Sequence, residues 1–365
     1  MDVYIIGAGI VGLSLARELA ENGINATVYE SKATPEEGAD KASGILSISG
    51  IKRAGIDISN AVINELDGAI IRAGNQELNV RARTSQAYVL DRKVLAVNAY
   101  RNAVKSGAKV ILKKRINREE LIELGKSNLI VGADGAISTV ASTFNFPEIK
   151  DYILTYKAIF SVPQFENTHQ VIMEFSKATP GFFGWIVPYG NKRIEVGVGV
   201  NSRNKKTSSR AFDEFTKSEL VQKIIDGAKK ESGAASIIPI SARSITAKKN
   251  IALVGDAAGQ VKATTGGGII FGTECARLLA RTIEKGLDNE HMLERYDKEW
   301  RKFYGRDLTM HKHIYGYYAN ADTKKLERLL KFAKLFGMES FLSKYGDMDR
   351  PSIMLKRFIL RGLSN

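Results

Sequence analysis

A glycine pattern near the start of the chain strongly constrains its fold. The segment "DVYIIGAGIVG" places Gly7, Gly9 and Gly12 in the spacing G-x-G-x-x-G after a short apolar run, and "LSLARELAENG" continues with helical periodicity. In a strand–turn–helix unit, the first glycine permits the tight turn. The second lets a pyrophosphate approach the helix N-terminus, and the third lets helix and strand pack closely. Glu30 ends the next apolar run, "INATVYE", where a carboxylate accepts hydrogen bonds from an adenosine ribose. The pattern predicts a dinucleotide-binding unit for NAD or FAD, because the acid disfavours the 2′-phosphate of NADP.

Later motifs favour FAD over NAD. In "VGDAAG", Asp256 matches the aspartate that hydrogen-bonds the ribityl chain of FAD, and "VGADGAIST" resembles the D-G motif of aromatic-hydroxylase-type flavoproteins. "YVLDRKVL" resembles their third signature, which puts Arg92 near the ribityl and pyrophosphate groups. Two alternatives stay open: Asp134 of the D-G motif only caps its turn, and Arg92 is a surface helix residue. A second G-x-G-x-x-G and a C-x4-C pair are both absent, which excludes a disulfide-reductase-type enzyme.

Three consecutive glycines indicate a further cofactor contact. "TTGGGI" ends a loop at Gly266, Gly267 and Gly268, and a helical pattern begins at Ile269. The free N–H groups of a helix N-terminus, with no side chains in the way, stabilise the negative charge that a flavin pyrimidine gains on reduction. A flexible hinge is the alternative interpretation.

The patterns along the chain predict an α/β, Rossmann-like FAD-binding fold with an antiparallel β-sheet substrate domain and a helical C-terminal tail. The expected FAD-binding parts are residues 1–150, with a small inserted β segment at about 62–90, and residues 246–290. Residues 151–245 contain β-rich runs broken by turn residues and form the predicted substrate domain. A helix is predicted over Val89–Gly107, followed by the strand "AKVILKK". Residues 291–365 are basic and helical in pattern.

Composition narrows the class of protein. No apolar run in the 365 residues is long enough to span a bilayer, and Met1 leads almost directly into a strand, so a cytoplasmic protein is expected. The single Cys275 excludes a disulfide framework and reads as a small core residue. The formal net charge of +14 suggests an anionic partner, but no RNA-binding motif accompanies it, so nucleic acid is not expected.

Three segments together resemble the geranylgeranyl reductase family, particularly its archaeal branch acting on geranylgeranyl lipids. They are "GDAAG…TTGGGI", "PGFFGWIVPYG" and "YGDMDRPS", and the likeness runs the length of the chain. The resemblance implies an FAD-dependent oxidoreductase that reduces isoprenoid C=C bonds by hydride transfer from reduced FAD. It also implies an external electron donor, for which ferredoxin, a deazaflavin and NAD(P)H all stay open.

The chain departs from the family pattern in two places. The family motif Tyr-x-Trp-x-Phe-Pro is filled here by Phe183, Trp185, Val187 and Pro188. Phe183 and Trp185 point to one side of a strand and are predicted to wall a slot for a prenyl chain, with an ordinary sheet core as the alternative. Many relatives carry a cysteine near the flavin, but "DKASGIL" has Lys41 or Ala42 there. A mechanism that depends on this thiol does not carry over.

The predicted site can be stated residue by residue. No catalytic side chain and no metal ligand is predicted, and Phe183, Trp185 and Pro188 are the expected substrate contacts. The expected cofactor contacts are Gly7, Gly9, Gly12, Glu30, Ala42, Ser43, Gly44, Arg92, Ile116, Asp256, Gly266, Gly267, Gly268 and Ile269.

The C-terminal region leaves its own questions. His311 and His313 are expected on a solvated helix, and "GDMDRPS" is expected to dock the tail. "LERLLKFAKLFGMESFLSKYG" interleaves Leu, Phe and Lys at helical spacing, so it either lies on a membrane surface or packs on the protein's own core. Two other functions stay open: an aromatic-hydroxylase-type monooxygenase, and a non-catalytic flavoprotein that binds lipid.

Overall fold

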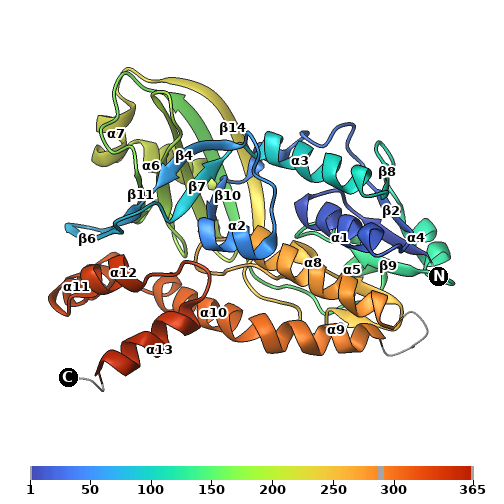
Figure 1. Ribbon diagram of the computed structural model, residues 1–365. Helices are drawn as coiled ribbons and strands as arrows, with labels where there is room; N and C mark the ends of the chain where they lie inside the picture. The colour runs from blue at the N-terminus through green and yellow to red at the C-terminus, as the bar shows by residue number, and fades with distance from the viewer. Residues whose placement is uncertain (1, 287–291, 363–365) are drawn as a thin grey trace.

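The structure, a computed structural model, describes residues 2–286 and 292–362. Figure 1 shows an α/β layer on the right, a curved β-sheet at the upper left and the C-terminal helices beneath both. The N-terminal strand enters the α/β layer, and the chain ends on the far side of the molecule at α13 (Pro351–Gly362).

The α/β layer is built on a six-stranded sheet in the order β15-β16-β9-β1-β2-β8. All neighbouring strands are parallel except β15 and β16. The strands are β1 (Val3–Ile6), β2 (Ala26–Tyr29), β8 (Lys109–Ile111), β9 (Leu129–Gly132), β15 (Ala247–Lys248) and β16 (Ile251–Leu253). Helices α1 (Ile10–Glu21), α3 (Arg92–Lys105) and α8 (Ile269–Glu284) contribute to the hydrophobic cluster on one face, and α4 (Arg118–Leu124) and α5 (Thr139–Thr143) to the cluster on the other. Helices on both faces explain why these strands read as continuous apolar runs.

Helix α3 starts later than the sequence predicts. Ala87–Leu90 form the strand β7, and the helix begins at Arg92 rather than at Val89. The reason is a cap: the Asp91 carboxylate accepts hydrogen bonds from the backbone N–H groups of Lys93 and Val94.

The second sheet has seven strands in the order β14-β10-β13-β12-β11-β5-β6. Two of them, β5 (Gly68–Ala73) and β6 (Gln76–Arg81), come from the segment between β2 and α3. The others are β10 (Tyr152–Ser161), β11 (Gln170–Phe175), β12 (Gly184–Pro188), β13 (Arg193–Asn201) and β14 (Lys229–Pro239). Every pair formed within residues 151–245 is antiparallel, as expected. The one parallel pair joins β11 to β5, which comes from the earlier segment. A small sheet joins β3 (Ile45–Ser47), β7 and β4 (Val62–Leu66).

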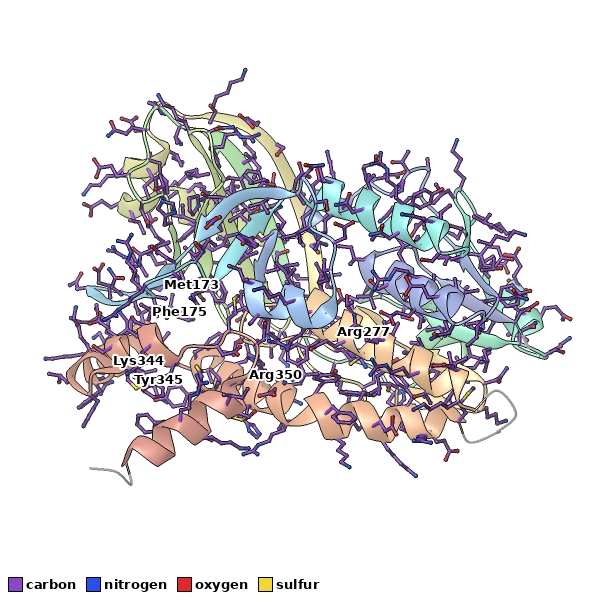
Figure 2. The ribbon with its side chains drawn as sticks, viewed as in Figure 1. Met173, Phe175, Arg277, Lys344, Tyr345 and Arg350 are labelled. Carbon is purple, nitrogen blue, oxygen red and sulfur yellow. The ribbon has the colours of Figure 1, made fainter. Side chains whose placement is uncertain are left out.

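The two faces of the seven-stranded sheet have different neighbours. On one face Val196 and Val198 pack with Phe212 and Phe215 of α6 (Ser208–Thr216) and Val221 of α7 (Glu219–Ile225). On the other, aromatic side chains pack against the C-terminal helices. Figure 2 shows Met173 and Phe175 of β11 lying above those helices, and both belong to this cluster. This second face is the one that borders the predicted site.

The C-terminal region is helical, as predicted. It comprises α9 (Met292–Trp300), a π-helical turn (Arg301–Gly305), α10 (Arg306–Ala319), α11 (Thr323–Leu335), α12 (Met338–Tyr345) and α13. Helices α11 and α12 cover the edge of the large sheet, where the backbone N–H groups would otherwise be open to pairing. Three of these groups donate to tail side chains: Asn75 to Glu327 (2.8 Å), Asn79 to Glu339 (2.8 Å) and Arg81 to Ser343 (3.0 Å).

Candidate flavin and substrate site

The predicted cofactor residues gather at one edge of the six-stranded sheet. Gly7 follows β1, Glu30 follows β2, Asp134 follows β9, and Asp256 lies in the short 3-10 turn (Gly255–Ala257) just after β16. These four strands are neighbours and parallel, so their carboxyl ends meet at the same edge. In open α/β sheets this edge is where nucleotides bind.

The three glycines of the first turn differ in what surrounds them. Gly7 has a φ of +107°, and a Cβ there would lie 2.4 Å from the Ala133 carbonyl oxygen. A Cβ on Gly12 would lie 2.1 Å from the Gly7 carbonyl oxygen, so close helix–strand packing requires this glycine. Among the described residues, a Cβ on Gly9 would meet nothing within 4 Å, and no side chain caps the helix that Gly9 begins. The polypeptide itself therefore does not require a glycine at position 9, whereas a pyrophosphate at this helix N-terminus would.

Hydrogen bonds fix the Glu30 carboxylate beside this turn. One carboxylate oxygen accepts from the backbone N–H of Ala8 (2.8 Å), and the other accepts from the N–H of Lys32 (2.9 Å) and the hydroxyl of Ser31 (3.1 Å). The contacts fix the carboxylate at the end of β2, in the position expected of a ribose acceptor.

Asp256 and Arg92, two side chains of opposite charge that influence each other, lie in the same region. Burial raises the pKa of Asp256 to about 6, although the positive charge of Arg92 opposes the shift. Burial likewise lowers the pKa of Arg92 to about 10. The Arg92 Nη1 atom is buried without a hydrogen-bond partner among the described residues. Asp256 is half-buried, and no described donor bonds to its carboxylate. Buried polar groups are rarely left unpaired, so the two side chains have the donor and acceptor capacity that the ribityl–pyrophosphate part of FAD would use. Arg92 is half-buried at the first position of α3, and its contact with the cofactor stays a prediction.

The triple glycine leads into α8 with an open N-terminus. Gly266 has a φ of +76°, and Gly268 begins the helix with no side-chain cap. A Cβ on Gly268 would lie 2.6 Å from the Asp256 Oδ1 atom, and one on Gly267 would lie 2.7 Å from Lys262 Cε. The close contact places the N-terminus of α8, and with it Ile269, beside the predicted ribityl contact.

The loop from Ala42 to Gly44 joins this edge to the large sheet. A Cβ on Gly44 would lie 2.0 Å from the Leu90 carbonyl oxygen, so the loop can approach β7 only with glycine at this position. The Ala42 carbonyl accepts from Lys157 Nζ (3.1 Å) of β10, and the Ser43 hydroxyl donates to Glu195 of β13. Sequence reasoning missed Lys157 and Glu195, although a charged residue inside each of the apolar runs "YILTYKAIF" and "RIEVGVGV" was the available signal.

The predicted substrate residues are unequal in accessibility. Phe183 is buried, with its ring stacked on Phe182 at 4.1 Å between centroids, and Pro188 is also buried. Trp185 is half-buried and contacts the Phe183 ring edge-on at 6.2 Å. Of the three residues, Trp185 offers the most surface to a ligand.

Two other residues, Asp134 and Ile116, make local contacts. The Asp134 carboxylate accepts from the Ser138 hydroxyl (2.6 Å) and the Val140 N–H (3.1 Å), so it stabilises its own turn. Ile116 is buried in the hydrophobic cluster with Ile6 and Leu121. A cofactor contact at Ile116 stays a prediction.

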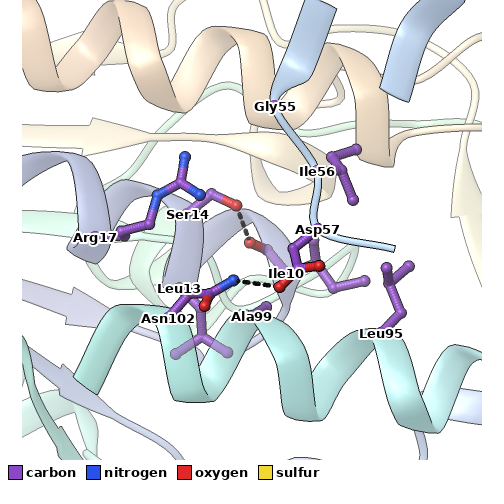
Figure 3. A pocket seen from close by; sticks show the side chains of 10 residues that line it. All are labelled: Ile10, Leu13, Ser14, Arg17, Gly55, Ile56, Asp57, Leu95, Ala99 and Asn102. Atoms are coloured by element: carbon purple, nitrogen blue, oxygen red, sulfur yellow. Dashed lines mark hydrogen bonds between the residues drawn. The ribbon is translucent and has the colours of Figure 1, made fainter. Parts of the chain in front are cut away.

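Figure 3 shows a small cavity between α1, α3 and the segment Gly55–Asp57, lined by Ser14, Arg17 and Asn102 among others. Its volume of about 20 Å³ suits a single water molecule, and it is too small for a prenyl chain.

The C-terminal segment docks through a buried polar cluster, as expected for "GDMDRPS". The Asp349 carboxylate is fully buried and accepts from Lys262 Nζ (2.7 Å), Arg53 Nη2 (3.3 Å) and the Ser47 hydroxyl. Burial alone would raise the pKa of Asp349, but these partners lower it overall. Lys262 also adjoins the triple glycine, since its N–H donates to the Gly267 carbonyl (3.1 Å).

His311 belongs to the same cluster, so its expected place on a solvated helix is wrong. Its Nε2–H donates to the Asp349 carbonyl (3.0 Å), and its Nδ1 accepts from the Thr264 hydroxyl (2.7 Å). Burial, with Lys262 nearby, lowers the pKa of His311 to about 4. His313, two residues on, is exposed as predicted.

The buried His311 predicts an acid-sensitive fold. In the unfolded chain its pKa is 6.5, so below that pH the unfolded state binds more protons than the native state, and stability falls as the pH drops from about 6.5 toward 4. When the pH is lowered from 7 to 4.5, the free energy of unfolding measured in urea should fall by about 2–3 kcal/mol more for the parent protein than for the His311→Gln variant. Equal losses in the two proteins would contradict this assignment.

Comparisons with known proteins agree with the geometry. A family model described as "FAD dependent oxidoreductase" matches residues 2–60, and one described as "FAD binding domain" matches residues 102–309, more than half of the chain. The chain is 28% identical over 338 residues to digeranylgeranylglycerophospholipid reductase 2 of Methanopyrus kandleri, covering 84% of this chain and 83% of that protein. It is 27% identical over 368 residues to an uncharacterized protein of Methanocaldococcus jannaschii, covering 96% and 92%.

Solved structures show the same fold. A geranylgeranyl bacteriochlorophyll reductase-like protein from Thermoplasma acidophilum superposes with a TM-score of 0.81 at 18% identity, covering 97% of this chain and 94% of that one. A flavin-dependent brominase superposes with a TM-score of 0.67 at 13% identity, covering 100% and 99%. The same architecture thus carries more than one flavin chemistry.

Proposed function

This chain belongs to the FAD binding domain family and is an FAD-dependent oxidoreductase of the geranylgeranyl reductase family, and from that membership we propose that it saturates C=C bonds of geranylgeranyl chains in isoprenoid lipids. The observation that carries the proposal is the placement of Trp185. This half-buried indole lies on the sheet face that borders the flavin-side loop Ala42–Gly44.

The residues at this sheet edge fit FAD. Glu30 would bind the adenosine ribose, Gly9 would face the pyrophosphate, and Arg92 with Asp256 would bind the linker. Bound there, FAD would supply the hydride for reduction of the alkene. The N-terminus of α8 would stabilise negative charge on the pyrimidine side of the ring.

A prenyl chain has no hydrogen-bonding groups, so a site that binds it must offer close apolar contact and exclude water. Trp185 gives dispersion contact, and the aromatic cluster behind it, with Phe182 and Phe183, keeps water from that wall of the site. These side chains would orient the alkene and exclude water while the reaction proceeds.

The test is anaerobic reduction of lipid. The purified protein with FAD and dithionite should convert geranylgeranyl ether lipids to species heavier by two hydrogens for each bond reduced, as read by mass spectrometry. An incubation without FAD and one without dithionite are the controls. Unchanged lipid would sink the proposal, and NADPH-driven oxygen uptake stimulated by lipid would favour the monooxygenase instead.

We propose further that the protein takes its lipid from the surface of an anionic membrane through the outer side of α11. Leu329, Phe332, Leu335 and Phe336 are 39%, 58%, 72% and 80% exposed, and the exposed cations Lys324, Lys325, Arg328 and Lys331 accompany them. We call these eight residues the tail face. The opposite side of α11 packs on the protein through Leu326 and Leu330. Among the described residues no helix is long and apolar enough to cross a bilayer, so such contact would be peripheral.

Vesicle flotation tests the tail face. Replacing Leu335 and Phe336 with serine should reduce binding to phosphatidylglycerol vesicles by about tenfold or more, because two apolar side chains no longer enter the interface. Val104→Ser is the matched control, since Val104 is 45% exposed on α3, away from the tail. Equal binding by the double variant and the parent would refute the assignment.

A further inference from the structure

A buried carboxylate on β13 collects three donors from three different segments. Glu195 is 1% exposed, and its oxygens accept from Lys157 Nζ (2.7 Å), from Trp185 Nε1 (2.8 Å) and from the Ser43 hydroxyl. Lys157 is also buried and donates in addition to the Ala42 carbonyl (3.1 Å). We call Ser43, Lys157, Trp185 and Glu195 the clamp.

The strand register explains how these side chains meet. Lys157 of β10 and Trp185 of β12 both stand opposite Gly197 of β13, and Glu195 lies two residues along on the same face. A Cβ on Gly197 would lie 2.2 Å from the Trp185 ring, so the indole occupies the space that a side chain would fill. Its N–H edge is directed to Glu195. The ring is therefore held between a glycine surface and a carboxylate.

Stability alone does not account for the clamp. Removing two charges from water costs several kcal/mol per ion, and well-packed apolar residues in place of a buried ion pair are often equally or more stabilising. The pair does provide fixed directions, because a carboxylate that accepts three hydrogen bonds sets the positions of all three donors. What it fixes here is an aromatic wall of the proposed slot and the loop on the flavin side of the same slot.

We propose that Glu195 is a positioning residue that holds the Trp185 indole and the Ala42–Gly44 loop at a set distance, and so sets the width of the slot that receives the prenyl chain. This inference rests on the proposed function for the identity of the ligand. Lys157 balances the charge of Glu195 and ties the loop backbone to β10. Neither residue is required to touch the reacting atoms.

The experiment uses the full-length protein with Trp300→Phe as the background, which leaves Trp185 as the single tryptophan. In that background, Lys157→Met/Glu195→Leu removes both charges and every acceptor for the indole. Lys157→Met/Glu195→Gln also removes both charges but keeps one carbonyl oxygen for the indole N–H. Asp297→Asn is the matched control, because Asp297 is also a partly buried carboxylate hub, bonded to Thr246 and Arg301 away from the slot.

The first readout needs neither substrate nor turnover. We call Lys157→Met/Glu195→Leu the leucine variant and Lys157→Met/Glu195→Gln the glutamine variant. Relative to the background, the acrylamide quenching constant of the Trp185 fluorescence should rise at least threefold in the leucine variant and stay within about 1.5-fold in the glutamine variant. It should stay unchanged in Asp297→Asn. If the leucine variant is quenched no more than its background, the proposal is wrong, whatever the enzyme does with lipid. Circular dichroism of each variant confirms that a folded protein is being compared.

The second readout separates positioning from cofactor loading. The leucine variant should retain FAD affinity within about threefold, lose at least tenfold in kcat/KM for the geranylgeranyl lipid, and be substantially rescued by glutamine. Loss of activity with no rescue by glutamine would overturn the positioning role. If the parent protein itself reduces no lipid, the proposed function fails, while the quenching result still tests the clamp.

Discussion

The Asp349→Ala variant should lose about 3–5 kcal/mol of its free energy of unfolding, one of the two largest effects expected from single substitutions in this protein. Asp349 is fully buried and is the anion that Lys262 and Arg53 share. Its removal leaves the buried ammonium of Lys262 with the Met348 carbonyl as its one acceptor among the residues that the structure describes. Breaking a buried pair from one side is costly because the remaining charge is not solvated.

Two further substitutions make this test specific. Asp322→Asn, at the exposed cap of α11, should cost about 1 kcal/mol or less. Lys262→Met/Asp349→Leu removes both charges and should recover part of the loss. Urea unfolding measures all three, and FAD affinity should fall with Asp349→Ala because Lys262 supports the loop of Gly267. A loss below about 1 kcal/mol would show that the cluster does not anchor the tail.

The second large effect concerns the first glycine turn. Gly12→Ala should cost about 3 kcal/mol or more even in the FAD-free protein, because its Cβ would lie 2.1 Å from a backbone oxygen that cannot move aside. Gly9→Ala should leave the stability of the FAD-free protein within about 0.5 kcal/mol, since its φ of −68° suits alanine and its Cβ meets nothing. It should nevertheless weaken FAD binding at least about tenfold.

The pair therefore separates folding from cofactor binding. Thermal or urea unfolding of FAD-free protein gives the first quantity, and flavin fluorescence titration gives the second. If Gly9→Ala binds FAD as tightly as the parent protein, the pyrophosphate does not lie at this helix N-terminus, and the assigned orientation of the cofactor is wrong.

The sequence was informative where function depends on glycine and on strand ends. Gly7, Glu30 and Asp256 each follow an apolar run, so parallel pairing of those runs was enough to predict that they meet. The family resemblance, confirmed by the comparisons, came from short motifs of the same kind. Local chemistry at a fixed spacing carries this information.

The features that the sequence did not predict depend mostly on contacts between segments that are far apart in the chain. His311 and its partner Thr264 are separated by 47 positions, and nothing near His311 in sequence indicates that it is buried. Lys157 and Glu195 lie on adjacent antiparallel strands, and their pairing follows from a register that periodicity does not specify. The start of α3 was missed for a smaller reason: Asp91 was read as a helical position, whereas its carboxylate caps the helix.

The parallel pairing of β5 with β11 has a consequence for how this protein can be dissected. A recombinant fragment of residues 151–245 would contain β11 but not β5, and the exposed backbone of β11 would become a template for self-association. A soluble autonomous module would have to include residues 62–90 as well, joined by circular permutation or co-expression. Segments of the two large sheets alternate along the chain, so the two sheets have to fold together.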